Sequence, residues 1–164
     1  MVKIITGKID SEKTTKLLSV YREKNEGDGF ALPKLYSHNQ IAGQRLVRLS
    51  TKENVVFSLK KSFLPEHWNE AYSYDDYSFS IEGRAFFERG MEHMLLTGAS
   101  PIFLDEIGPL ELEGKGFASA LRKLLTMQVD LIIVVRDSCF EDVIRQFHIT
   151  DYTLVPVDRF KLVF

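Results

Sequence analysis

One stretch near the N-terminus decides the fold: Val-Lys-Ile-Ile-Thr-Gly-Lys-Ile-Asp-Ser-Glu-Lys-Thr-Thr, residues 2–15. Its first five residues predict a short buried strand that ends at Gly7, and residues 13–24 predict a helix with one apolar side. Around this junction the pattern G-x-x-x-x-G-K-[ST] matches at Gly7, Lys13 and Thr14. A loop of this type binds phosphates through backbone N–H groups at a helix N-terminus. Its lysine contacts the β- and γ-phosphates, and its hydroxyl contacts Mg²⁺.

This candidate phosphate-binding loop departs from the pattern at one position. Glu12 stands where the second glycine belongs. Glycine lets the backbone approach the phosphates closely and adopt positive φ, whereas glutamate adds a Cβ and a carboxylate. We therefore expect impaired triphosphate binding; an ordinary loop before a charged helix start is the alternative. The predicted phosphate-binding residues are Gly7, Lys8, Ile9, Asp10, Ser11, Glu12, Lys13, Thr14 and Thr15.

A second block follows the apolar run at residues 101–104 and begins with Asp105 and Glu106. An acid at the end of a buried strand is costly unless it is paired or lies near a cation. In phosphate-loop enzymes such an aspartate holds Mg²⁺, usually through water, and a following glutamate can polarise the attacking water. We predict that Asp105 and Thr14 bind the metal and that Glu106 is the catalytic base. An ordinary strand end running into a polar loop is the alternative.

Strands and helices alternate along most of the chain. Further strands are predicted at 30–37, 44–50, 54–59, 77–81, 101–106, 131–135 and 152–157, and further helices at 83–98, 117–127 and 138–147. This order predicts right-handed crossovers and a mainly parallel sheet flanked by helices. The expected fold is α/β, a single domain over residues 1–164 with a small antiparallel insert at about 30–59. Ligands bind such sheets at the carboxyl ends of the strands, which here are residues 7–15, 105–116 and 136–138.

The two blocks together resemble a known family. Ile5-Thr6-Gly7, Ser11, Lys13-Thr14-Thr15 and the string Leu104-Asp105-Glu106-Ile107-Gly108-Pro109-Leu110-Glu111-Leu112 are similar to the thermophilic nucleoside-triphosphatases, which are also described as cancer-related nucleoside-triphosphatases in animals. The resemblance extends over about residues 2–157 and includes Gly29-Phe30. It implies a P-loop nucleoside-triphosphate hydrolase fold with Walker A and Walker B motifs. It also implies slow, Mg²⁺-dependent hydrolysis of ATP, GTP and other nucleoside triphosphates to the diphosphate.

Composition limits the partners. The 164 residues carry 21 Lys and Arg against 23 Asp and Glu, a net charge of −2, so no nucleic-acid partner is expected. The single cysteine, Cys139, excludes an internal disulfide, and no Cys cluster is available for zinc. No apolar segment approaches 18 residues, so no membrane association is expected and a cytoplasmic location is predicted. The sequence does not set the oligomeric state.

Several other side chains have two interpretations each. Arg136 either faces the γ-phosphate or lies in solvent beside Asp137, which we favour, and Lys115 has the same two interpretations. Glu111 either orients the loop after Asp105 or has a solvated or helix-dipole role. Trp68 and its neighbouring tyrosines (Tyr72, Tyr74 and Tyr77) either stack on a base or form a hydrophobic cluster, which we favour. The scattered histidines (His38, His67, His93 and His148) lack metal-ligand spacing, and Cys139 is taken as structural.

Four functions are compatible with these patterns. The leading one is hydrolysis of Mg²⁺-bound nucleoside triphosphate between the 7–15 loop and Asp105-Glu106. A second is a nucleotide-binding or regulatory module that has lost hydrolysis because of Glu12. A third is a non-catalytic interaction protein that keeps the fold, and a kinase-like phosphotransferase is the fourth, because the same motifs serve it.

Overall fold

The computed structural model describes residues 1–7 and 12–157. The chain divides into two compact units, Met1–Gly27 with Ser100–Phe164, and Asp28–Ala99. The expectation that the whole chain acts as one domain stays a prediction. Within the described residues, no helix is long and apolar enough to cross a membrane.

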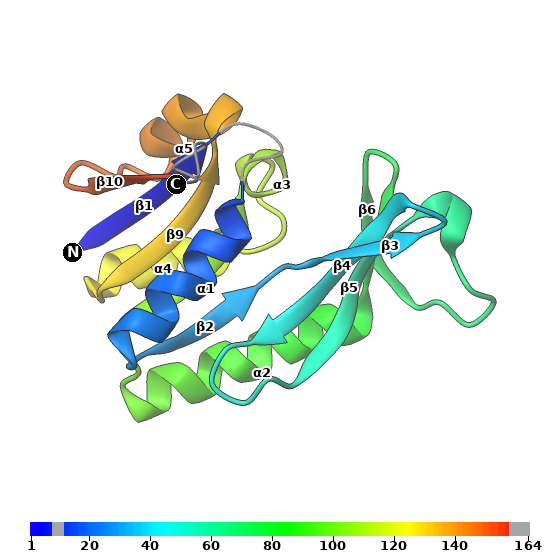
Figure 1. Ribbon diagram of the computed structural model, residues 1–164, viewed down its shortest axis with the longest axis horizontal. Coiled ribbons are helices and arrows are strands. Elements are labelled where there is room, and N and C mark those ends of the chain that lie inside the picture. The colour runs from blue at the N-terminus through cyan, green and yellow to red at the C-terminus, as the bar shows by residue number, and fades with distance from the viewer. Residues whose placement is uncertain (8–11, 158–164) are drawn as a thin grey trace, which may run out of the picture. The chain divides into compact units, whose positions relative to one another are not determined.

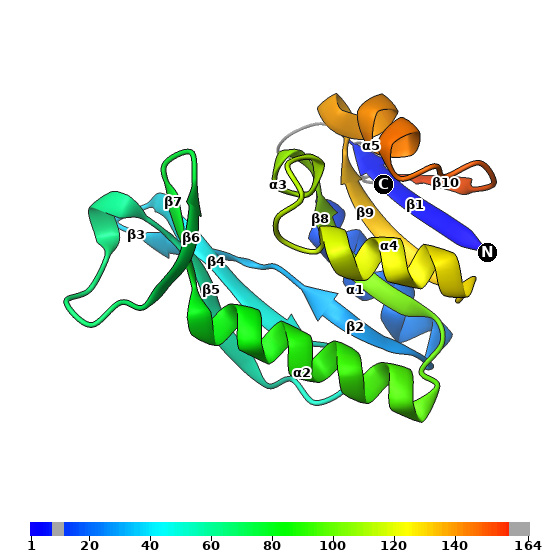
Figure 2. The same ribbon diagram turned by 180° about the vertical axis from the view of Figure 1, so that it is seen from behind.

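The first unit contains a parallel sheet in the order β10-β1-β9-β8. Its strands are β1 (Val2–Gly7), β8 (Ile102–Ile107), β9 (Leu131–Arg136) and β10 (Thr153–Pro156). Its helices are α1 (Lys13–Lys24), α3 (Pro109–Leu112), α4 (Ala118–Met127) and α5 (Phe140–Gln146), with a short 3-10 turn, η2, at Asp137–Cys139. Helices α1 and α4 lie on opposite faces of this sheet, as Figures 1 and 2 show from its two sides. The predicted α/β architecture with a parallel sheet is therefore confirmed.

The core of this unit is built from β-branched and aliphatic side chains. Leu131–Val135 of β9 is buried throughout because it is the inner strand between β1 and β8, and inner parallel strands are covered on both faces. Helix α1 covers one face through Leu17, which is fully buried, and Tyr21, whose ring meets Phe103 edge-on. All the strands run the same way, so the C-terminal ends of β1, β9 and β8 lie at one edge.

The second unit contains an antiparallel sheet in the order β2-β4-β5-β7-β6, with β3 paired to β4. The elements are β2 (Asp28–Ala31), β3 (Lys34–Ser37), β4 (Gln40–Arg48), β5 (Asn54–Lys60), β6 (Glu70–Tyr74) and β7 (Tyr77–Ser80), then helix α2 (Ile81–Thr97), with a 3-10 turn, η1, at Lys61–Phe63. Figure 1 shows α2 running along the sheet, and the helix packs on β2, β4, β5 and β7. The predicted antiparallel pairing is confirmed, since Leu46 of β4 lies opposite Val55 of β5.

Three details of this unit differ from the sequence prediction. The strand predicted at 30–37 is two strands, because Pro33 has no N–H to continue a ladder. The strand predicted from residue 44 already begins at Gln40, since the turn before it is confined to His38 and Asn39, both with positive φ. Strand β6 was not predicted, and the antiparallel strands continue to Ser80, beyond the expected 30–59 range.

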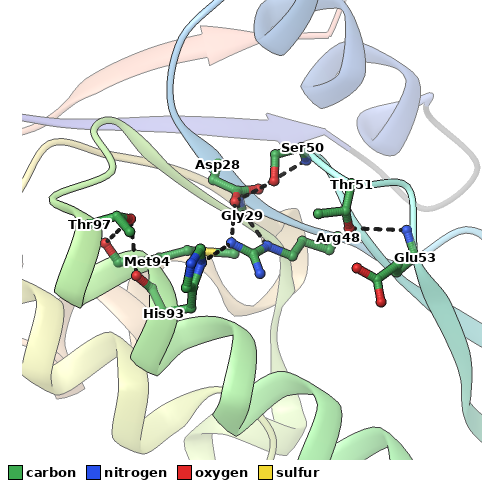
Figure 3. A network of polar contacts seen from close by, with 9 residues as sticks. All are labelled: Asp28, Gly29, Arg48, Ser50, Thr51, Glu53, His93, Met94 and Thr97. Carbon is green, nitrogen blue, oxygen red and sulfur yellow. Dashed lines mark hydrogen bonds and ion pairs between the residues drawn. The ribbon is translucent and has the colours of Figure 1, made fainter.

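A polar network around the buried Asp28 joins β2, β4 and α2 within the second unit (Figure 3). The Asp28 carboxylate is 5% exposed and accepts hydrogen bonds from the Ser50 hydroxyl (2.6 Å) and the Arg48 Nε (2.9 Å). The Nη2 atom of Arg48, which lies 2.9 Å from the same Asp28 oxygen, is also 2.8 Å from Nδ1 of His93 on α2. Because arginine only donates, the His93 ring nitrogen is the acceptor in this contact.

Candidate functional site

The two sequence blocks meet at the C-terminal edge of the parallel sheet. The Thr14 hydroxyl, in the first turn of α1, donates a 2.8 Å hydrogen bond to Oδ2 of Asp105 in β8, 91 residues away in sequence. Asp105 is only 1% exposed, and Thr14 is half-buried. The Lys13 ammonium donates to the carbonyl of Gly7 at 3.2 Å, so it folds back over the end of β1. The two described ends of the predicted loop therefore lie together, and Thr14 at its C-terminal end contacts the predicted strand end.

Part of the predicted phosphate-binding loop cannot be compared with the structure. Lys8, Ile9, Asp10 and Ser11 lie outside the described residues. Of the others, Gly7 ends β1, and Thr15 is exposed on the first turn of α1.

The backbone conformation of Glu12 shows whether this position needs a glycine. Glu12 precedes α1 with φ −82° and ψ 57°, and its carbonyl accepts the Lys16 N–H at 2.9 Å. This φ is open to any residue, so the structure does not require a glycine here for a left-handed conformation. The side chain is exposed and does not cap the helix. What distinguishes Glu12 from glycine in this conformation is its charge and bulk near the loop.

The oxygen atoms of Thr14 and Asp105 are suited to one class of metal. Mg²⁺ prefers hard oxygen ligands, and in nucleotide sites it takes one or two protein groups together with waters and phosphate oxygens. A hydroxyl and a carboxylate already 2.8 Å apart provide such a pair. The donor set therefore fits Mg²⁺.

A bulge redirects the chain at Glu106. In the pairing of β8 with β9, Leu104 lies opposite Ile133 and Ile107 opposite Val135, so three steps along β8 match two along β9. The extra residue leaves Glu106 with φ 58°, a left-handed conformation that is uncommon for a residue with a Cβ. Bulges of this kind re-aim side chains beside functional sites. The sequence predicted a plain strand end here and gave no sign of the bulge.

Arg136 contacts the candidate base. It ends β9 opposite Gly7 of β1, and its guanidinium lies 3.5 Å from Oε1 of Glu106. The two side chains are 37% and 27% exposed, respectively, so this ion pair is partly solvated. The interpretation favoured from the sequence is a solvated Arg136 beside Asp137, whereas the structure places its guanidinium beside Glu106 in a partly solvated ion pair.

Glu111 is buried rather than solvated. Its side chain is 3% exposed and accepts two backbone hydrogen bonds, from Gly108 at 2.8 Å and from Phe117 at 3.1 Å. Burial raises the pKa of the Glu111 carboxyl to about 7, although the backbone N–H groups act in the opposite direction. The solvated interpretation of Glu111 is therefore wrong, and its loop-orienting role stays a prediction. Gly114 and Gly116 indicate a loop after Glu111. This segment is too short to show a hydrophobic periodicity from which the burial of Glu111 could be predicted.

Of the other candidates, Trp68 and Tyr72 belong to the second unit, and Cys139 and Lys115 to the first. The indole N–H of Trp68 donates to the Ser78 hydroxyl at 2.7 Å, and Tyr72 stacks on Phe79, which agrees with a hydrophobic cluster in the second unit. Cys139 is buried. Among residues 1–7 and 12–157, no group of three His, Cys, Asp or Glu side chains could hold a metal ion. Lys115 lies 3.9 Å from Glu113 in the loop after Glu106.

The parallel sheet, the helix after β1 and the joined blocks define a P-loop nucleoside-triphosphatase fold. Solved structures agree: the chain is similar to THEP1 from the hyperthermophile Aquifex aeolicus, with a TM-score of 0.69 and 17% identity over 97% of this chain and 91% of that one. It is also similar to a human cancer-related nucleoside triphosphatase, with a TM-score of 0.61 and 22% identity over 95% and 88% of the two chains.

Sequence comparison identifies the family. The pattern of the NTPase family matches residues 3–161. The nucleoside-triphosphatase THEP1 of Sulfolobus acidocaldarius is 31% identical over 144 residues, which cover 84% of this chain and 78% of that protein. The chain belongs to the NTPase family, a family of proteins that bind or hydrolyse nucleoside triphosphates. The family resemblance noted in the sequence is confirmed.

Proposed function

We propose that this protein hydrolyses nucleoside triphosphates, ATP or GTP, to the diphosphate with Mg²⁺ at the edge formed by the ends of β1 and β8. The observation that carries the proposal is the 2.8 Å hydrogen bond between Thr14 and Asp105. It joins the start of α1, the helix after the predicted phosphate loop, to the acidic end of β8, which is separated from β1 by β9 in the sheet. Phosphoryl-transfer sites of this class likewise combine a phosphate loop with an acid that holds the metal. A cytoplasmic location, without nucleic-acid or membrane partners, is part of this proposal.

The residues at this edge have distinct roles. The loop from Gly7 to Thr15 surrounds the phosphates, and the Lys13 ammonium exchanges the Gly7 carbonyl for the β- and γ-phosphates. Thr14 and Asp105 would hold Mg²⁺. When bound, Mg²⁺ neutralises charge on the β- and γ-phosphates.

Glu106 is the proposed general base. It takes a proton from water as the water oxygen forms a bond to the γ-phosphorus, and the bond from that phosphorus to the β–γ bridging oxygen breaks. Its strained backbone supports this role, because residues in sparsely populated conformations cluster at functional sites. Arg136 restrains the same carboxylate and provides a cation at the edge where charge develops.

One observation favours a second function, nucleotide binding with little or no hydrolysis. Glu12 places an exposed carboxylate where P-loop proteins have glycine. Repulsion between this carboxylate and the polyphosphate weakens binding and disturbs the alignment needed for hydrolysis. A sensor or regulatory module would tolerate the loss of hydrolysis, whereas an enzyme with this residue would turn over slowly.

Two measurements separate these functions. Calorimetric titration with ATP and Mg²⁺ measures binding, and release of inorganic phosphate measures turnover, both in the parent and in Glu106→Gln. We expect Glu106→Gln to bind like the parent and to release phosphate roughly 10²-fold more slowly, the usual scale for loss of a general base. The matched control is Glu88→Gln, which removes the same negative charge at an exposed position on α2. Binding without phosphate release in the parent supports the regulatory module, and unchanged release in Glu106→Gln contradicts the role of Glu106.

A further inference from the structure

A buried carboxylate closes the loop that follows Glu106. The two oxygens of Glu111 accept separate backbone hydrogen bonds from opposite ends of residues 108–117: Oε1 from Gly108 and Oε2 from Phe117. One side chain thus ties the start of the loop to its end. Each bond joins a carboxylate oxygen to a backbone N–H, and charge-assisted hydrogen bonds of this type are stronger than neutral ones.

The bulge at Glu106 needs support from its neighbours. The left-handed backbone of Glu106 is unfavourable for a residue with a Cβ and persists only where surrounding contacts fix it. On its C-terminal side the first fixed points are Ile107, which pairs with Val135, and Gly108, whose N–H is held by Glu111. Gly108 is also packed beneath the Arg136 side chain, because a Cβ added at Gly108 would lie 3.7 Å from the Arg136 Cβ. The bond from Glu111 therefore fixes the chain where it leaves the bulge.

We propose that Glu111 is a positioning residue for nucleotide hydrolysis: by holding Gly108 and Phe117 it keeps the bulge in place and the Glu106 carboxylate aimed at the attacking water. The inference rests on the proposed role of Glu106 as the base. Glu111 itself is buried and acts through the backbone, not by contact with the nucleotide.

A simple helix cap accounts for only part of this geometry. Glu111 is the third residue of α3, and a glutamate there commonly accepts the N–H of the residue that precedes the helix, here Gly108. Capping does not explain the second bond, to Phe117, six residues further on. It also does not explain Gly116, which has a positive φ and at which an added Cβ would collide with Oε2 of Glu111. The loop is shaped around the carboxylate.

Steady-state kinetics of three variants test the proposal: Glu111→Gln, Glu106→Gln and the double variant. Glutamine keeps the shape of Glu111 but turns one oxygen into an N–H₂ group that faces a backbone N–H donor. We expect Glu111→Gln to lower kcat roughly 10- to 100-fold, the scale of a misplaced catalytic group, with KM within about threefold of the parent. In the double variant kcat should equal that of Glu106→Gln within about twofold, because a residue that acts through Glu106 has nothing left to position.

A general loss of structure gives a different result. Partial unfolding removes active molecules whatever the base, so it would lower kcat further in the double variant, and this multiplicative outcome overturns the proposal. A Glu111→Gln kcat within twofold of the parent, while Glu106→Gln is slow, overturns it as well and leaves the proposed function standing. An unchanged kcat in Glu106→Gln overturns both.

Two glycines provide a matched pair if Glu111→Gln does not fold. Gly114 and Gly116 both have positive φ, 81° and 60°, so alanine strains the backbone at each. A Cβ at Gly116 collides with Oε2 of Glu111 and lies 2.8 Å from Leu110, whereas a Cβ at Gly114 meets nothing within 4 Å. We expect Gly116→Ala to lower kcat at least tenfold relative to Gly114→Ala. Equal values of kcat in the two variants overturn the proposal, because backbone strain alone would then explain any loss.

Discussion

Replacing Glu111 with glutamine should change how the stability of this protein depends on pH. Burial raises the pKa of the Glu111 carboxyl from 4.5 to about 7 in the folded chain. Between these two values the folded state therefore holds a proton that the unfolded state has released. Stability falls with pH wherever the folded state binds more protons, so this carboxyl stabilises the fold least above pH 7.

The size of this effect follows from the two pKa values. One pKa unit corresponds to about 1.4 kcal/mol, so a rise from 4.5 to about 7 gives about 3 kcal/mol across the window. The glutamine variant has no such group and lacks this contribution. We expect the free energy of unfolding of the parent, minus that of Glu111→Gln, to fall by about 3 kcal/mol between pH 4.5 and pH 8.

Urea denaturation followed by circular dichroism measures both free energies at several pH values. The amide also loses a hydrogen bond, but this loss shifts the difference equally at every pH, so the slope isolates the carboxyl. Glu88→Gln is the control, and its difference from the parent should stay flat. A Glu111→Gln difference that is constant within about 0.5 kcal/mol, or that rises with pH, would refute the reasoning, because Glu111 would then titrate like an exposed acid.

Three further predictions concern charged side chains. Asp28→Ala removes the buried carboxylate that pairs with Arg48, whose side chain is 14% exposed, and should lower the free energy of unfolding in urea by about 3–5 kcal/mol. Arg145→Met, which breaks an exposed pair, should cost about 0.5 kcal/mol, and equal losses would contradict the stabilising role of the Asp28 pair. Glu12→Gly should tighten Mg²⁺-ATP binding in calorimetry about fivefold, since roughly 1 kcal/mol of repulsion is expected for exposed charges about 4 Å apart; no gain would show that the loop tolerates the glutamate. Lys13→Ala should weaken the same binding by about 1.5–3 kcal/mol, and an unchanged affinity would place the phosphates elsewhere.

Much of the parallel-sheet unit could be predicted from the sequence. The helix predicted at 13–24 is α1 with the same bounds, because its apolar side and the loop before it are local signals. The apolar run at 131–135 is the buried inner strand β9. The pairing of the two motif blocks followed from the rule that the carboxyl ends of parallel strands share an edge, and the bond from Thr14 to Asp105 agrees with it.

The remaining features depend on tertiary contacts that a linear pattern does not encode. Strand β6 is recognisable only by its pairing with β7, since its side chains show no clear alternation of apolar and polar residues. The bulge at Glu106 arises because Ile107 pairs with Val135, a register that the sequence does not display. Glu111 is an acid in a polar loop, and only the backbone N–H groups folded around it make its burial tolerable.

The central claim is that Thr14 and Asp105 form the metal side of a nucleotide site. The most direct test is the affinity for ATP, measured by calorimetry with Mg²⁺ and with EDTA, in the parent and in Thr14→Val, which removes the hydroxyl at nearly constant shape. Thr126→Val, the same change on α4 at a hydroxyl that bonds only its own helix, is the control. The account predicts that Mg²⁺ tightens ATP binding in the parent and in Thr126→Val and has little effect in Thr14→Val. An equal Mg²⁺ effect in all three proteins, or no Mg²⁺ effect in the parent, would contradict it.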